Sequence, residues 1–205
     1  EDKIRFDTGG TERVVIDSDG ITVSSGLING VGIKYNITNF SNSLLISNDA
    51  GTGTLSSASN NTGLGHQAFN NLTSGDDNTA MGTNSMFANT TGSDNTGVGL
   101  SSLNANTTGD NNTAVGSGAL AANTTANANI AIGSDALNDN TTGALNVAVG
   151  TYALDTNTTA ERNTAIGYAA MDANTEGQYN TAVGANALDA NTTASYNTTV
   201  GYRSL

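Results

Sequence analysis

Apolar and polar residues follow a fixed pattern from residue 61 to the end of the chain. The motif Asn-(Thr/Ile/Val)-(Ala/Gly/Thr)-apolar-Gly recurs nine times at a spacing of 17 residues, without an insertion. We number the positions of each unit from its first residue, the Asn at 61, 78, 95, 112, 129, 146, 163, 180 and 197. Because a fixed internal period marks repeat architectures, the pattern predicts one structural unit stacked nine times in the same way.

Two positions of the unit are apolar in every copy. Position 4 is occupied by Leu64, Met81, Val98, Val115, Ile132, Val149, Ile166, Val183 and Val200. Position 9 is occupied by Phe69, Met86, Leu103, Leu120, Leu137, Leu154, Met171, Leu188 and Leu205. We expect these rows to supply the large apolar side chains, with small residues at positions 3 and 8. The sequence leaves open which row faces the interior of the coil and which faces a partner.

The length and composition of the unit favour β-structure over helix. Helical repeats are longer, about 33 residues or more, and Asn, Thr and Gly are poor residues for a helix interior. A unit of 17 residues fits one coil with two short strands, the first in "NTAVG" and the second around "AL", and with a turn in "NTTG". We therefore expect an all-β fold, a parallel β-solenoid (β-roll) of nine coils and about 40 Å in length.

Stacked coils place each residue about 4.8 Å from its own copy in the next coil. An Asn side chain suits such a row because its amide group both donates and accepts hydrogen bonds. The Gly at position 5 of every unit indicates a positive φ angle or a close backbone approach. The candidate structural ladders are Asn112, Asn129, Asn146, Asn163 and Asn180, and Gly116, Gly133, Gly150, Gly167 and Gly184.

Residues 1–55 lack the repeat and predict a small N-terminal β-rich module. "KIRF" and "ERVVID" alternate as strands do, with Gly9-Gly10 as the turn between them. "SDGITV", "VGIKYNITNF" and "SNSLLIS" predict further strands, and residues 48–60 indicate a linker rich in Gly, Ser and Asn. We divide the chain into this module, residues 1–55, and a solenoid, residues 56–205.

The charge and composition of the chain disfavour two classes of partner, nucleic acid and membrane. Six basic residues against 18 acidic ones give a net charge of −12, which disfavours binding to nucleic acid or to an anionic membrane. No apolar run is long enough for a membrane-spanning helix, so we expect no membrane insertion. Glu1 does not open a signal peptide, and the ninth unit stops at Leu205, so we expect a piece of a longer protein.

The core of one coil is thin. Small cores usually need a metal, disulfides or oligomerisation. The chain has no Cys, which excludes disulfides, thiol catalysis and Cys-ligated zinc, and it carries no metal motif. Association of several copies around a shared axis is therefore the simplest expectation.

Few residues indicate catalysis or metal binding. "DTG" at residues 7–9 lacks the second copy of an aspartic protease loop, and "DSDG" at residues 17–20 lacks the downstream Glu of a calcium loop. His66 has no specified partner for a triad or a metal site. Solvated turns explain the acidic row at position 10 better than a calcium ladder; the row is Asp155, Asp172 and Asp189. We expect no enzyme, no cofactor and no metal site.

The tyrosines are the candidate binding residues on the surface. Exposed aromatic side chains on a rod can contact sugar rings, and equally can pack as ladders or touch another subunit. The candidate saccharide contacts are Tyr168 and Tyr202 at position 6, and Tyr179 and Tyr196 at position 17.

Two stretches of the sequence resemble known fibrous proteins. The unit "NTAVGxxALxxNTTGxx" resembles the YadA-like head repeats of trimeric autotransporter adhesins, and is more similar still to repeat blocks in the tail fibres of tailed phages. The segment "DKIRFDTGGTERVVIDSDGI", residues 2–21, is similar to a segment of phage fibres that end in an endosialidase-type chaperone. The resemblance implies a left-handed β-roll in a homotrimer, although the adhesin period is shorter than 17.

The function that the resemblance implies is structural. The chain is expected to be the rigid shaft of a homotrimeric bacteriophage tail fibre in the virion, which spaces or presents host-receptor binding. Its partners are then its own copies, with a host cell-surface glycan or protein as a further partner. Two alternatives stay open: a bacterial cell-surface adhesin head, and an ice-binding solenoid that uses the Thr row at position 13.

Overall fold

The computed structural model describes residues 4–8, 11–17, 20–23, 27–28, 31–37, 40–47 and 55–205. Every regular element in these ranges is a β-strand. The same ranges hold no helix of the length and apolarity that a membrane crossing needs.

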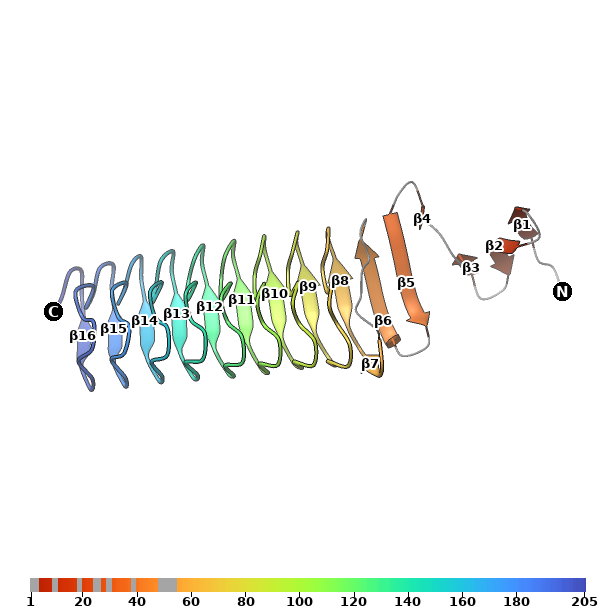
Figure 1. Ribbon diagram of the computed structural model, residues 1–205. Helices are drawn as coiled ribbons and strands as arrows, with labels where there is room; N and C mark the ends of the chain where they lie inside the picture. The colour runs from red at the N-terminus through yellow and green to blue at the C-terminus, as the bar shows by residue number, and fades with distance from the viewer. Residues whose placement is uncertain are drawn as a thin grey trace.

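One three-residue strand per unit builds the solenoid, at positions 2 to 4. The strands are β8 (Thr62–Leu64), β9 (Thr79–Met81), β10 (Thr96–Val98), β11 (Thr113–Val115), β12 (Ile130–Ile132), β13 (Val147–Val149), β14 (Thr164–Ile166), β15 (Thr181–Val183) and β16 (Thr198–Val200). Each pairs in parallel with the next, so that Ala114 lies beside Ala131 and Ala131 beside Ala148. The coils follow one another as a rod (Figure 1). The predicted all-β parallel solenoid of about nine turns is confirmed.

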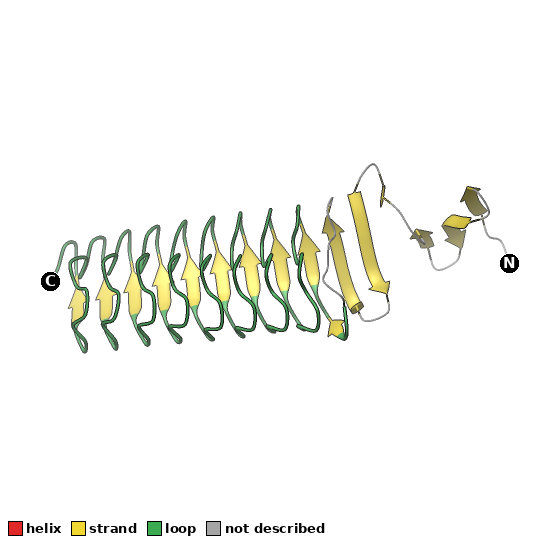
Figure 2. Cartoon of the chain, in the orientation of Figure 1, coloured by secondary structure: helices red, strands yellow, loops and turns green. Residues whose placement is uncertain are grey.

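The second strand predicted around "AL" is wrong. Positions 6 to 11 form turns, and each coil has a single strand, with loops over the rest of the coil in Figure 2. The reason lies in the backbone, because positions 7 and 9 both take left-handed φ angles, 54° at Asp135 and 52° at Leu137. An extended strand cannot contain such residues. The turns still bond to the neighbouring coils, with the Leu137 amide donating to the Ala153 carbonyl at 3.0 Å.

The strand geometry decides which apolar row is buried. Side chains alternate across a strand, and position 3 points inward, with Ala114, Ala131 and Ala148 fully buried. Position 4 therefore points outward, and Ile132 is 41% exposed. The interior is filled by the small residues at positions 3 and 8 and by the large residue at position 9, such as Leu137. Each of the first eight coils thus buries one large apolar side chain at position 9, whereas Leu205 in the ninth coil is 87% exposed.

The N-terminal strands fall into two sheets. β1 (Ile4–Thr8), β2 (Thr11–Asp17) and β3 (Gly20–Val23) form an antiparallel sheet of their own. β4 (Leu27–Ile28), β5 (Val31–Ile37) and β6 (Phe40–Ser47) are antiparallel to one another and extend the solenoid sheet. β6 pairs in parallel with β8 and with β7 (Ala58–Ser59), so β6 adjoins the first coil.

Some predictions for this part fall outside the described residues. They include the Gly9-Gly10 turn, residues 48–54 of the predicted linker, Ser18 and Asp19 of "DSDG", and Gly9 of "DTG". The division of the chain at residue 55 stays a prediction, because β6 lies on the N-terminal side of it and shares a sheet with the coils.

Candidate functional site

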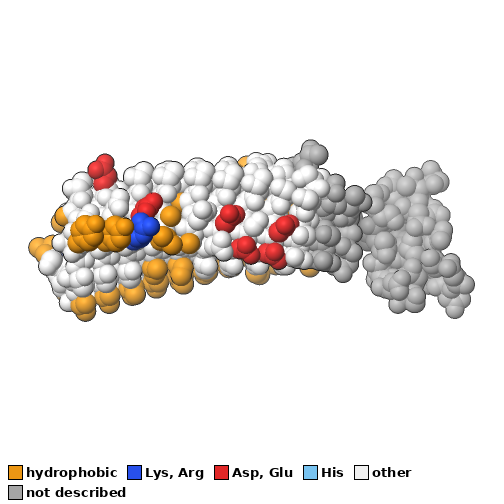
Figure 3. All heavy atoms as spheres, turned by 90° about the horizontal axis from the view of Figure 1, so that it is seen from below, with side chains coloured by type: hydrophobic (Ala, Val, Ile, Leu, Met, Phe, Trp, Pro, Cys, Tyr) orange, Lys and Arg blue, Asp and Glu red, His pale blue; other side chains and the backbone are white. Residues whose placement is uncertain are grey.

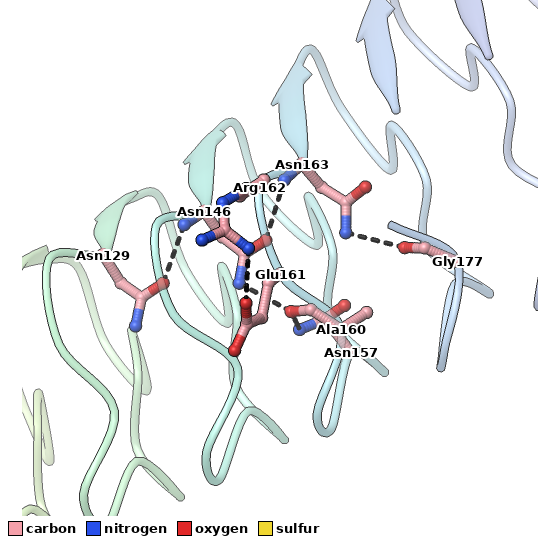
Figure 4. Close-up of polar contacts among 8 residues, drawn as sticks. All are labelled: Asn129, Asn146, Asn157, Ala160, Glu161, Arg162, Asn163 and Gly177. Carbon is pink, nitrogen blue, oxygen red and sulfur yellow. Dashed lines mark hydrogen bonds and ion pairs between the residues drawn. The ribbon is translucent and has the colours of Figure 1, made fainter. Parts of the chain in front are cut away.

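The Asn at position 1 of each coil lies inside the solenoid and ties it in two directions. The Oδ1 atom of Asn146 accepts a hydrogen bond of 3.0 Å from the backbone amide of Asn163 in the next coil. The Nδ2 atom of Asn146 donates across its own coil to the Ala160 carbonyl at 2.9 Å. Asn129 and Asn163 make the same two contacts. Figure 4 shows the row, with the Asn146 amide donating to the Asn129 side chain and the Asn163 side chain donating to the Gly177 carbonyl. All these side chains are fully buried, so the row is an internal chain of amide groups.

A second buried Asn row runs beside the first, at position 12. The Nδ2 atom of Asn157 donates to the Oδ1 atom of Asn140 in the preceding coil at 2.8 Å. The same Nδ2 atom donates to the Ala160 carbonyl at 3.1 Å. The position-15 carbonyl thus accepts from both Asn rows, which closes the turn from inside the coil. Because a buried polar group is costly without a partner, the shared carbonyl matters as an acceptor for both buried Asn side chains.

The Gly at position 5 meets two demands. Gly150 has a φ of 137°, in the left-handed region that L-residues avoid. A Cβ built on Gly150 would lie 2.3 Å from the carbonyl oxygen of Gly167 in the next coil. The predicted ladder residues Gly116, Gly133, Gly167 and Gly184 share this conformation, with φ between 138° and 140°. The strand therefore ends at a residue that only Gly accommodates.

The four candidate tyrosines do not form one site. Tyr179 and Tyr196 stack with ring centroids 5.1 Å apart and planes 8° from parallel. The Arg162 guanidinium covers the other side of Tyr179, 5.4 Å from its centroid, and also bonds to Glu161 at 2.8 Å. Tyr168 instead packs edge-on against Tyr152, and Tyr202 lies under Arg203.

This packing changes the saccharide hypothesis. Sugar rings stack on the face of an aromatic ring, and both faces of Tyr179 are already covered, by Arg162 and Tyr196. Tyr196 is 79% exposed and keeps one face unstacked within the described residues. The ladder explanation therefore accounts for Tyr179 better than a sugar contact does, and saccharide binding stays a prediction.

The carboxyl groups of Asp155 and Asp172, in the acidic row at position 10, are partly buried. Burial raises the pKa of Asp155 from 3.8 to about 6, and the carboxylates of Asp139, Asp172 and Asp135 add to the shift. Burial, with Asp189 second, also raises the pKa of Asp172. Among the described side chains, no group of three or more His, Cys, Asp or Glu is arranged as metal ligands. His66 is half-buried at the turn after β8.

The Thr row at position 13 is used by the fold. The hydroxyl of Thr107 donates to the Thr124 carbonyl at 3.0 Å, and that of Thr124 to the Thr141 carbonyl at 3.1 Å. The row lies in a bend rather than on the strands. The hydroxyl protons of these residues are therefore used in hydrogen bonds to the next coil. This disfavours the Thr row as a surface that orders water.

The surface feature that the sequence did not resolve is the outward face of the strands. In the space-filling view, hydrophobic side chains gather in rows along the rod (Figure 3). The signal that could have located this face is strand alternation: once the small residue at position 3 is placed inside, position 4 must lie outside. The geometry thus defines a parallel β-solenoid held by internal polar ladders, with an exposed apolar row. Comparison of the chain with known protein families, characterised proteins and solved structures finds no match.

Proposed function

We propose that the chain is the shaft of a homotrimeric bacteriophage tail fibre, a rigid spacer in the virion that carries host-receptor binding away from the particle. The observation that carries the proposal is the unbroken register of the coils, in which the strand pairing and the bonds of the position-1 Asn row repeat from one coil to the next. A spacer needs this uniformity, because any irregular coil would be a place to bend.

The mechanism is mechanical. Each coil is bonded to both neighbours through its strand, its turns and its buried Asn row. An inner coil can open only if two such interfaces break together, so local unfolding is suppressed along the rod. The result is stiffness and resistance to proteases, which act on transiently opened segments.

The homotrimer follows from the thin interior and the resemblance. One large apolar side chain per coil from the repeat is a small core, and oligomerisation is a usual remedy. The phage fibre is favoured over a bacterial adhesin head because both the repeat and residues 2–21 resemble phage fibres. A host glycan or protein is then bound by other parts of the fibre, and the shaft itself is structural rather than catalytic.

A change of shaft length tests the spacer role. Deleting residues 129–162 removes two whole coils, and the remaining coils meet in the same register. We expect the β-type circular dichroism to persist and the maximum dimension in small-angle X-ray scattering to fall by about 10 Å. Deleting residues 129–136 is the control, because it removes part of a coil, including Asn129, and interrupts the 17-residue register. An unfolded two-coil deletion would contradict the spacer, and firm binding of the intact chain to host cells would favour the adhesin.

A further inference from the structure

The outward face of the strands carries an apolar row that the fold of one chain leaves exposed. We propose that two further copies, parallel and in register, cover the side chains at positions 2 and 4 of β8–β16, which we name the strand face. This inference rests on the proposed homotrimer and assigns the residues that hold it together.

The first observation is an exposed apolar row with no gap. Position 4 is apolar in every coil, and six of its members are among the large exposed hydrophobic residues: Leu64, Met81, Val115, Ile132, Ile166 and Val200. Ile130, at position 2, adds a further side chain that is 40% exposed. Single exposed apolar residues are normal, whereas a continuous row marks an interaction surface.

The second observation is the distribution of charge. The acidic residues of the coils lie at positions 7, 10, 11, 14, 16 and 17, and no Asp, Glu, Lys or Arg occupies positions 1 to 6 of any coil. The chain carries a net charge of −12, so two copies repel wherever their acidic rows approach. The strand face is the side on which copies can approach without bringing like charges together.

The third observation is the repeat itself. The strand face repeats at each coil, about every 4.8 Å, over about 40 Å. A partner that matches it along this whole length must carry the same repeat, and a second copy placed parallel and in register does so. With a width of about 10 Å, three such faces bury on the order of 1,200 Å² together, which is within the range of specific interfaces.

Disulfide trapping tests the assignment, because the chain has no Cys of its own. Ile132→Cys places a thiol on the strand face, and Thr142→Cys places one on an exposed bend of the same coil. Under mild oxidation we expect Ile132→Cys to give covalent dimers at least five times more abundant than those of Thr142→Cys on a non-reducing gel. If Thr142→Cys instead gives more covalent dimer than Ile132→Cys, and the unmodified chain is a trimer in solution, the strand face is not the interface. The proposed trimeric fibre is then unaffected.

A charge placed on the strand face provides an independent readout. Ile132→Glu should lower the solution mass toward that of one chain, while β-type circular dichroism is retained. Thr142→Glu is the matched control, because position 14 already carries Glu176 in another coil. Dissociation by Thr142→Glu, with Ile132→Glu still trimeric, would overturn the assignment. If the unmodified chain has the mass of one chain, the homotrimer and the strand face fail together.

Discussion

Single residues set the shape of each coil through conformations that most side chains avoid. Position 5 is always Gly, whereas positions 7, 9 and 17 place residues such as Tyr152, Leu154 and Arg162 at φ angles of 53° to 60°. A left-handed residue costs roughly 1–2 kcal/mol unless it is Gly, Asn or Asp. The stacked coils hold these residues in place, because inter-coil hydrogen bonds reach the same turns.

Gly150 should be far less tolerant of a side chain than Gly118. Gly150→Ala adds a Cβ against the Gly167 carbonyl oxygen in a strained conformation, and we expect a loss of about 2–4 kcal/mol in unfolding free energy. Gly118→Asn is the control, because Asn84 and Asn186 occupy the same position with φ near 56°. Chemical denaturation of both variants measures the difference, and equal stabilities would contradict the account.

Asp155 should make the fold less stable as the pH rises. Burial, with its acidic neighbours second, raises the pKa of Asp155 in the folded state to about 6, against 3.8 for its usual value. The folded state therefore holds the proton more tightly, and stability is lost between pH 4 and pH 6 as this carboxyl ionises.

Replacing the carboxyl by an amide should remove this effect. Asn fits the position, because Asn138 at the same place donates to the Gly118 carbonyl at 3.0 Å. Asp155→Asn should gain about 1–2 kcal/mol at pH 7.5, a value reduced for its partial exposure, and little at pH 4. Thermal melts at the two pH values measure this, with Asp94→Asn on an exposed turn as the control. An equal gain at both pH values would contradict the ionisation argument.

At the scale of the element, the coil is held as much by buried amides as by apolar packing. Both Asn rows are fully buried through the middle coils and converge on the position-15 carbonyl. This arrangement compensates for the single large apolar residue that each coil contributes to the interior.

Removal of one buried amide should therefore be costly. Asn146→Ala leaves the Asn163 amide without its acceptor and removes one of the two donors to the Ala160 carbonyl. An unpaired buried group costs about 1–3 kcal/mol, so we expect a loss of about 3 kcal/mol. Asn127→Ala removes one exposed hydrogen bond, to the Asp110 amide, and should cost less than about 1 kcal/mol. Urea denaturation measures the unfolding free energy of both variants. A loss for Asn146→Ala as small as that for Asn127→Ala would show that the Asn row is not needed for stability.

The sequence predicted some elements and not others for physical reasons. The period, the first strand and the Asn ladder at position 1 follow from the repetition of Asn and Gly, because few arrangements use an identical amide in every copy. The turns at positions 6 to 11 could not be predicted, because Leu137 and Leu154 hold left-handed angles for which Leu carries no preference. The exposure of position 4 could not be predicted either, because it depends on the side chain at position 3 pointing into the coil.

At the scale of the molecule, residues 61–205 form a stack in which the same coil recurs about nine times. Its exposed apolar row and its charge-free strand face are at odds with a solitary rod of net charge −12. The proposed fibre would resolve this conflict, because three copies that meet as we propose would cover the row and leave the acidic turns in water. The candidate tyrosines then lie on turns outside the strand face, where Tyr179 and Tyr196 strengthen contacts between coils.

The solution mass of residues 1–205 tests the central claim most directly. Multi-angle light scattering on the purified chain, with circular dichroism on the same sample, measures assembly and fold together. The account predicts three times the mass of one chain, with a β-type spectrum that survives strong heating. A folded protein with the mass of one chain would contradict it, because the coil stack would then be stable with its apolar row in water.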